Sequence, residues 1–148
     1  MIVSENVHDL FECGAQTLFC PVNVAGVMGN GLACYFKAIA PQFFERYRTL
    51  CRTKQLRLDT LWIYPHEKHF FVAFPTKQHW SQPSKEEWIE RNLQKFVQTY
   101  KEKGITSVAV PHLGCGQGGL SYEKTVRPLL YKYLDPLDIP VHICIRLF

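Results

Sequence analysis

A glycine-rich segment in the last third of the chain is the feature best suited to do chemistry. Four glycines fall within the six residues 114–119, after the apolar run 107–110 and before a helical pattern that starts near Ser121. Without Cβ atoms, such a loop can turn several backbone N–H groups toward one anion, most often a phosphate, and a tight turn with positive φ is the alternative. The spacing is neither that of a P-loop nor G-x-G-x-x-G. It therefore predicts an anion-binding loop of another kind.

A second glycine-rich loop has the same placement between a strand and a helix. Residues 17–22 have the pattern of a buried strand, and residues 23–31 (NVAGVMGNG) interrupt it before a helix begins at Leu32. In open α/β sheets, ligands bind outside the carboxyl ends of the strands, where such loops converge. The two loops together predict a site that holds both ends of a diphosphate ligand.

A lysine follows a third apolar strand, in the segment 74–80 (FPTKQHW). Partial desolvation of Lys77 there would lower the pKa of its amine and make it a nucleophile or a proton donor, but from the spacing alone a solvated loop lysine is the favoured interpretation. His79 is a candidate base, although a histidine beside a tryptophan is more often structural. Trp80 is either a wall for a nucleobase or part of the core, and the core is the favoured interpretation.

Three further residues in these regions have two interpretations each. The Asn23 amide can donate to and accept from a sugar hydroxyl, or it can serve the turn that it begins. Asp9, after the first strand, can accept from an adenine amino group or cap the next turn, which is the more common role. Cys115 lies inside the second glycine loop, and we interpret it as a small side chain rather than a nucleophile. No Cys, His or carboxylate cluster has metal-ligand spacing, so no metal or other cofactor is expected.

Length, charge and cysteine usage limit the class of protein. A chain of 148 residues predicts one domain, residues 1–148. The net charge of +4 suits an anionic ligand or a nucleic-acid surface without deciding between them. Six scattered cysteines, no signal peptide and no membrane-spanning apolar run indicate reduced thiols in a cytoplasmic protein, which we expect to be a monomer without membrane contact.

The order of the elements predicts an α/β fold. We expect strands at residues 2–7, 17–22, 61–64, 70–74, 107–110 and 141–146, the third and fourth of which form a hairpin. We expect helices at residues 32–40, from 41 onward, from a capping box at 84–87 to about 103, and after 121, where Pro128 marks a new first turn or a kink. Strands that alternate with helices in this way indicate a three-layer α/β/α sandwich with a central mixed sheet.

Together these segments resemble the macrodomain family of ADP-ribose-binding modules over nearly the whole chain. The resemblance rests on residues 8–11 (HDLF), 21–33 (PVNVAGVMGNGLA), 74–80 (FPTKQHW) and 111–120 (PHLGCGQGGL). It is greatest to the branch that contains the DarG-type antitoxins, which remove ADP-ribose from thymidine in DNA, and the terminal ADP-ribose glycohydrolase of animal cells. The lysine of the third segment is the most specific signal, because generic macrodomains lack it.

The resemblance assigns a role to each matching position. It implies that Lys77 and Asn23 are the catalytic residues, with Asn23 orienting the distal ribose, and that Asp9 and the backbone of Leu10 hold the adenine. The other ligand-binding residues that it implies lie beside the lysine and in the two glycine loops: Thr76, Val27, Met28, Gly29, Asn30, Gly31, Leu32, Gly114, Cys115, Gly116, Gln117, Gly118, Gly119 and Leu120.

Two departures from the branch matter. The animal enzyme pairs its lysine with an aspartate in the second loop, whereas residues 116–119 contain no acid, as in DarG, so a lysine–aspartate mechanism is not expected. DarG also has a C-terminal domain for its toxin, which this sequence does not match, and a toxin-binding role is not expected.

The expected function is that of an ADP-ribosyl glycohydrolase that removes ADP-ribose from a modified macromolecule, in the first place thymidine in DNA. The sequence leaves guanosine, carboxylate and phosphate open as acceptors, and with them ADP-ribosylated protein. A non-catalytic ADP-ribose reader and an ADP-ribose 1″-phosphate phosphatase are the alternatives. The presence of the lysine favours the hydrolase, because a reader has no use for it.

Overall fold

The computed structural model describes residues 1–7, 9–29 and 31–144. Its centre is a six-stranded sheet in the order β1-β6-β5-β2-β4-β3. The strands are β1 (Ile2–Val7), β2 (Thr17–Asn23), β3 (Trp62–His66), β4 (His69–Lys77), β5 (Val108–Val110) and β6 (Val141–Cys144). Neighbouring strands are parallel except for the antiparallel pair β3 and β4. The predicted mixed sheet and hairpin are confirmed, and the hairpin forms one edge of the sheet.

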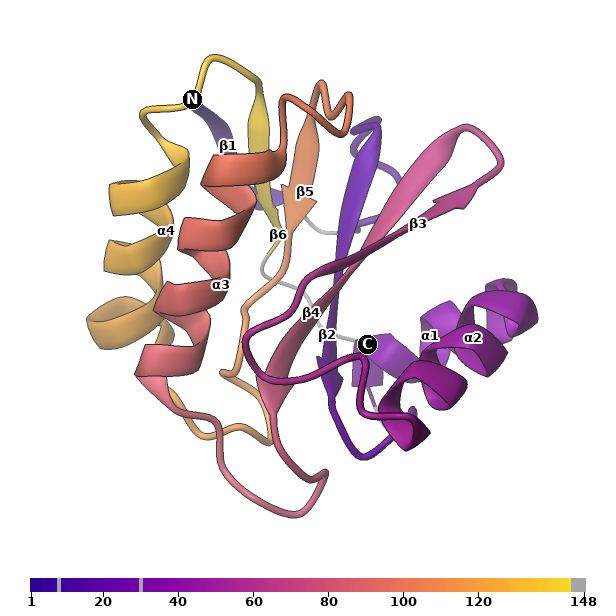
Figure 1. Cartoon of the computed structure of the whole chain (residues 1–148). Coiled ribbons are helices and arrows are strands. Elements are labelled where there is room, and N and C mark those ends of the chain that lie inside the picture. Colours follow the sequence, from indigo (N-terminus) through magenta and orange to yellow (C-terminus); the bar gives the residue numbers. More distant parts are fainter. Residues whose placement is uncertain (8, 30, 145–148) are drawn as a thin grey trace.

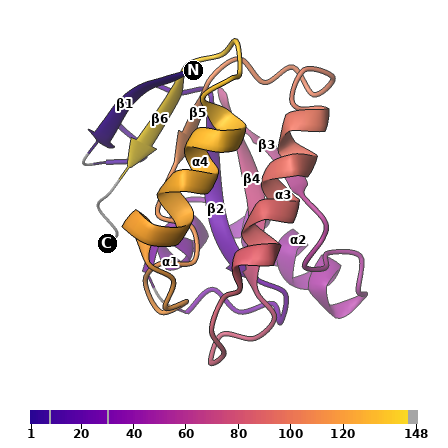
Figure 2. The same ribbon diagram turned by 90° about the vertical axis from the view of Figure 1, so that its left-hand side faces the viewer.

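Helices cover both faces of this sheet (Figures 1 and 2). One face carries α1 (Gly31–Ile39) and α2 (Pro41–Arg52). The other face carries α3 (Glu86–Thr99), the π-helical turn η1 (Tyr122–Val126) and α4 (Arg127–Leu134). The fold is therefore the predicted three-layer α/β/α sandwich. No helix among the described residues has both the length and the apolar character needed to cross a membrane.

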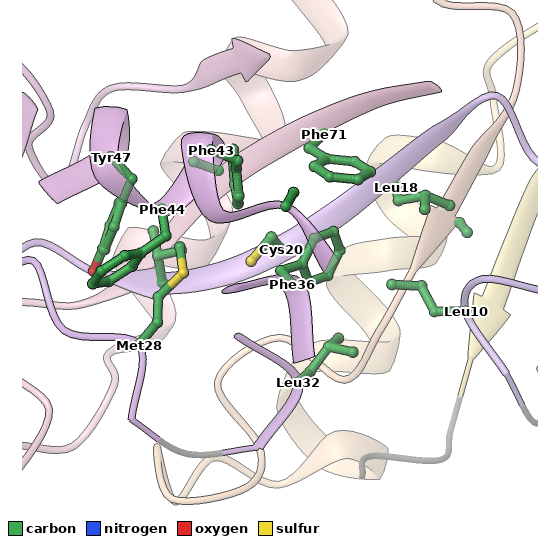
Figure 3. Packing of buried hydrophobic residues seen from close by; sticks show 14 of the residues in the cluster. Leu10, Leu18, Cys20, Met28, Leu32, Phe36, Phe43, Phe44, Tyr47 and Phe71 are labelled. Atoms are coloured by element: carbon green, nitrogen blue, oxygen red, sulfur yellow. The ribbon is translucent and has the colours of Figure 1, made fainter. Parts of the chain in front are cut away.

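Each helical layer packs its own hydrophobic cluster against the sheet. In Figure 3, Phe36 and Phe43 of the helices face Phe71 and Leu18 of the strands, and the rings of Phe36 and Phe71 meet edge-on at 4.9 Å. On the opposite face, residues of α3 and α4 enclose a second cluster that includes Phe19. Burial of each such side chain contributes about 1.5–3 kcal/mol. The strands are thus fixed from both sides, and the positions of their carboxyl ends follow from this packing.

The predicted capping box at the start of α3 is wrong. The N-cap residue is Lys85, without a capping side chain, and α3 ends at Thr99 rather than near Lys103. Ser84 instead lies against the second glycine loop, where its backbone N–H donates to the carbonyl of Gly118 at 2.9 Å. Local sequence suggested a helix cap, but the tertiary contact determines the role of this serine.

The other helix and strand predictions hold with small changes of bounds. Pro128 is tolerated because it falls in the first turn of α4, directly after η1. Positions 145 and 146 of the predicted last strand lie outside the described residues. All six cysteines are free, as expected for reduced thiols, and Cys20, Cys51 and Cys144 are buried.

Candidate active site

A cleft of about 580 Å³ lies at the carboxyl ends of β2, β4 and β5. Its walls come from the two glycine loops, the start of α1 and the residues around the end of β4. The residues that line it are Pro21, Val22, Asn23, Val27, Met28, Gly29, Gly31, Leu32, Ala33, Thr76, Lys77, Trp80, His112, Gly114, Cys115, Gly116, Gln117 and Gly118. Most of the predicted site residues therefore meet in one place.

The other predicted site residues lie outside this lining. Asp9 and Leu10 follow β1, and β6 separates that strand from β5. The Asp9 carboxylate accepts from the backbone N–H of Phe11 at 2.8 Å, so it caps the turn, while Leu10 is buried in the core. Gly119 and Leu120 close the second loop, where their backbone N–H groups donate to the carbonyls of Gly116 and Gly114 at 3.2 and 3.0 Å. Asn30 lies outside the described residues.

A β-bulge at Thr76 brings the two predicted catalytic residues side by side. Residues of β2 and β4 pair in regular register up to Val22 and Pro75, after which Asn23 pairs with Lys77. Thr76 is the extra residue, and its hydroxyl lies 3.5 Å from the carbonyl of Val22. Bulges change the direction of the side chains that follow them and are frequent beside active sites. Here the bulge sets the lysine directly across from the asparagine.

The Lys77 amine lies at the cleft in a partly desolvated position. Burial lowers the pKa of the Lys77 amine below its ordinary value. Its Nζ donates to the carbonyl of Trp80 at 3.3 Å and forms no salt bridge with any residue that the structure describes. None of the described lining residues is an aspartate or a glutamate. The amine therefore has no carboxylate beside it to keep it charged.

Asn23 organises the first glycine loop. Its Oδ1 accepts from the backbone N–H groups of Ala25, Gly26 and Val27 at 3.1–3.3 Å, and its Nδ2 donates to the carbonyl of Val27 at 2.8 Å. An amide nitrogen carries two hydrogens, and no described residue accepts the second. Asn23 thus performs the turn role that the sequence left open and keeps one donor for a ligand in the cleft.

Tyr47 of α2 supports the same loop from behind and was not identified from the sequence. Its hydroxyl donates toward the carbonyl and the Oδ1 of Asn23, at 2.7 and 3.0 Å. Burial raises the pKa of the Tyr47 hydroxyl, so it stays protonated as a donor. The sequence showed this tyrosine only as one position of an apolar helix stripe, and the hydrogen bond depends on tertiary packing.

The second glycine loop needs its glycines for two different reasons. Gly114 and Gly119 have positive φ values of +74° and +80°, which side chains rarely adopt. Gly118 has no space, because a Cβ atom there would lie 2.3 Å from the carbonyl oxygen of Gly114 and 2.4 Å from the hydroxyl of Ser84. The backbone N–H groups of Gly116 and Gly118 have no acceptor among the described residues. They are therefore available to an anion.

Cys115 and His112, in and just before this loop, differ in their ability to take part in chemistry. Burial raises the pKa of the Cys115 thiol to about 11, so the residue carries no thiolate at neutral pH, in keeping with its interpretation as a small side chain. The ring of His112 stacks on Tyr122 at 4.0 Å, and burial lowers the pKa of the imidazole. Its Nε2 is buried and has no partner among the described residues. His112 was not predicted from the sequence, although a polar residue two positions after the end of β5 was a signal.

Trp80 contradicts its favoured interpretation as a core residue. Half of its surface is exposed, and it stands at the rim of the cleft, where it holds the Lys77 amine through its carbonyl. A pattern of aromatic residues after a buried strand could not show that the chain turns outward at this point. Across the part of the chain that the structure describes, no group of three or more His, Cys, Asp or Glu residues could hold a metal ion.

A family model and the curated relatives of this chain agree with each other. The Macro domain family model matches residues 20–129. A DNA ADP-ribosyl transferase–DNA ADP-ribosyl glycohydrolase fusion protein of Thermosipho africanus is 37% identical over 158 residues, which cover 94% of this chain and 40% of the relative.

Two solved structures extend the comparison to the fold. The Thermosipho africanus DarTG in complex with ADP-ribose has a TM-score of 0.88 and 39% identity, with 93% of this chain and 39% of that chain covered. The macrodomain of Mycobacterium tuberculosis DarG has a TM-score of 0.90 and 32% identity, with 97% of each chain covered. The chain spans about two fifths of the length of the curated relatives that it matches.

Proposed function

This chain belongs to the macrodomain family, and on that basis we propose that it is an ADP-ribosyl glycohydrolase that removes ADP-ribose from thymidine in DNA. One observation carries the proposal: the half-buried Lys77, whose amine has a lowered pKa and whose backbone pairs with that of Asn23, lines a cleft formed by two glycine loops. A module that only binds ADP-ribose has no need of such an amine. The names of the relatives, DNA ADP-ribosyl glycohydrolases, support the choice of DNA as the acceptor.

The glycine loops hold the ADP-ribose part of the substrate in this proposal. The free N–H groups of Gly116 and Gly118 and the start of α1 at Gly31 bind the diphosphate, since unpaired backbone amides at a helix start attract anions. The second hydrogen of the Asn23 amide holds the distal ribose. The adenine lies beyond the cleft, toward Asp9 and Leu10, as the family resemblance implies. The complex contains one ADP-ribose for each chain.

Lys77 acts on the glycosidic bond by one of two routes. In the first, the bond between C1″ and the base breaks while the ammonium group gives a proton to the departing thymine, and water then adds to C1″ and restores the proton. In the second, the neutral amine attacks C1″ of the opened ribose and displaces the base, which takes up a proton, and water hydrolyses the Schiff base that results. The lowered pKa increases the share of neutral amine that the second route requires.

Parallel assays on three substrates test this function. The protein is incubated with an ADP-ribosylated single-stranded oligonucleotide, an ADP-ribosylated protein and ADP-ribose 1″-phosphate, and release of ADP-ribose is followed. We expect release from the oligonucleotide, and loss of that release in Lys77→Ala but not in Lys103→Ala, a control on the exposed surface after α3. Release from none of the three substrates, with ADP-ribose still bound, would make the protein a reader.

The proposal also includes the biological role, the location and the oligomeric state of the protein. In the Thermosipho relative, a transferase and a glycohydrolase share one chain by name. A glycohydrolase reverses what such a transferase adds, and this supports an antitoxin-like role for the present chain. We assign the protein to the cytoplasm and expect it to be a monomer. Size-exclusion chromatography with light scattering measures the oligomeric state directly.

A further inference from the structure

A second cleft, of about 730 Å³, lies beside the first and shares one wall with it. The wall is part of the segment that joins β4 to α3, the loop at the bottom of Figure 1. Lys77 and Trp80 line the first cleft, whereas Gln78, His79 and Gln82 line the second. A polymeric substrate that leaves the first cleft beside Lys77 therefore meets the second cleft directly.

The second cleft is positively charged. Lys54 and Arg57 line it from the loop that follows α2, and Arg91 lines it from α3; all three are exposed. None of them forms a salt bridge with a residue in the described ranges, and Asp59 is the one carboxylate among the described lining residues. Three unpaired cations converging on one hollow create a local potential that favours a polyanion.

The same cleft contains groups that fit the other parts of a nucleotide. Trp88 of α3 is half-buried in its lining and presents an indole ring, over which the Lys85 ammonium lies at 5.4 Å. The Nδ1 atom of His79 accepts from the backbone N–H of Ser81 at 3.2 Å and lies 2.8 Å from the Ser81 hydroxyl. That acceptor role leaves the ring proton on Nε2, where it can donate to a phosphate oxygen. Aromatic platforms combined with a cationic groove are typical of sites for single-stranded nucleic acid.

We propose that the second cleft binds the single-stranded DNA that flanks the modified thymidine. This inference rests on the proposed function and names the part of the substrate that the ADP-ribose cleft does not hold. The base is joined to C1″ beside Lys77, so its strand leaves the first cleft past the exposed Trp80 and runs along the shared wall. Arg57 and Arg91 neutralise phosphates of the flanking nucleotides, and Trp88 stacks on one of their bases.

Two independent measurements test the assignment. The first is the fluorescence anisotropy of an unmodified single-stranded oligonucleotide of about 12 nucleotides, which needs no catalysis. The second compares the KM for an ADP-ribosylated oligonucleotide with that for ADP-ribosylated thymidine, which has no flanking nucleotides. The variant is Arg57→Ala/Arg91→Ala, and the control is Lys68→Ala/Lys103→Ala, which removes the same charge from exposed positions at the opposite end of the sheet.

We expect the cleft variant to bind the oligonucleotide at least about tenfold more weakly than the wild type, and the slope of log K against log salt to become shallower by about 1.4. Its KM rises for the oligonucleotide and stays unchanged for ADP-ribosylated thymidine, and its affinity for free ADP-ribose is unchanged. Trp88→Ala weakens oligonucleotide binding by about 5- to 150-fold, and Trp88→Phe restores most of it. The control retains wild-type values in every assay.

The inference is overturned if the wild type does not bind the oligonucleotide, if the control loses as much affinity as the cleft variant, or if polyglutamate competes as well as DNA. These results differ from a failure of the proposed function. That failure is the absence of hydrolysis with both substrates, whatever the anisotropy shows. Hydrolysis of both substrates with equal KM values in the cleft variant and the wild type rejects the DNA cleft alone.

Discussion

Replacement of Gly118 by alanine tests how tightly the second glycine loop is built. The added Cβ would lie 2.3 Å from the Gly114 carbonyl oxygen, 2.8 Å from its carbon and 2.4 Å from the Ser84 hydroxyl. Two of these atoms belong to the backbone of the same loop, so no side-chain rotation relieves the contact. The loop must move away from Ser84 or carry the strain.

The expected loss of stability is the sum of the steric cost and the cost of a lost hydrogen bond. Overpacking of this kind costs about 1–3 kcal/mol. Loss of the 2.9 Å hydrogen bond from Ser84 to the Gly118 carbonyl adds about 0.5–1.5 kcal/mol. For a domain of this size, each kcal/mol lowers Tm by about 2–4 °C, so we expect a fall of at least about 3 °C. A displaced loop also loses a charge-assisted hydrogen bond to the diphosphate, which weakens ADP-ribose binding by about 10-fold or more.

Gly119→Ala is the matched control for this experiment. Gly119 lies next in the same loop with a φ of +80°, and a Cβ there would meet nothing within 4 Å. It therefore measures the strain of positive φ alone, about 1–2 kcal/mol. Scanning calorimetry gives the Tm of each variant, and titration calorimetry gives its affinity for ADP-ribose. If Gly118→Ala binds ADP-ribose as the wild type does and unfolds no earlier than Gly119→Ala, the steric argument is refuted.

The remaining predictions concern the lysine, the first loop, metal ions and the edge of the sheet. Lys77→Ala loses about 100-fold or more in turnover and keeps its ADP-ribose affinity, as single-turnover and calorimetric measurements would show, and full activity would rule out both routes. The turnover rate rises with pH toward the lowered lysine pKa if the amine is the nucleophile and falls if the ammonium is the proton donor, and borohydride trapping of an adduct separates the routes independently. Asn23→Ala weakens ADP-ribose binding and lowers Tm, because three backbone N–H groups lose their acceptor. Activity is unchanged by chelators, and activity that disappears in EDTA and returns with a divalent ion would contradict this. The hydrogen bond from Arg127 lowers the pKa of the Glu5 carboxyl to about 2. The ion pair therefore stabilises the folded protein fully above the pKa that Glu5 has in the unfolded chain, and this stabilisation is lost as the pH falls toward 2. The Tm difference between wild type and Glu5→Gln should shrink over that range, and a constant difference would show that the ion pair contributes nothing.

Much of the fold follows from the sequence because its signals are local. Apolar periods, proline at the start of α2, and glycines between strands and helices gave the order of elements, and alternation of strands with helices gave the layers. The positions of Asn23 and Lys77 at strand ends were also local facts, and parallel strands bring their carboxyl ends to one edge. The sequence therefore determined that the two glycine loops and the lysine would meet at one site.

Only the tertiary structure decided how these parts are supported. The bulge at Thr76, which sets Lys77 across from Asn23, depends on the register of two strands that lie about 50 residues apart in the chain. Tyr47 in α2 and Ser84, two residues before α3, support the two loops, although their local patterns indicated other roles. Short-range patterns contain no information about such contacts, since each depends on where another element packs.

The second cleft is the clearest case of this limit. Its cations come from the loop after α2 and from α3, and its wall comes from the residues after β4. In the sequence, Lys54, Arg57 and Arg91 are ordinary surface residues in a chain with a small positive net charge. They form one site only because the loop after α2 packs against α3, where the Asn92 amide donates to the carbonyls of Leu58 and Pro75 at 2.8 and 3.1 Å. Residue types were determined by the sequence, whereas their convergence was determined by the packing of the layers.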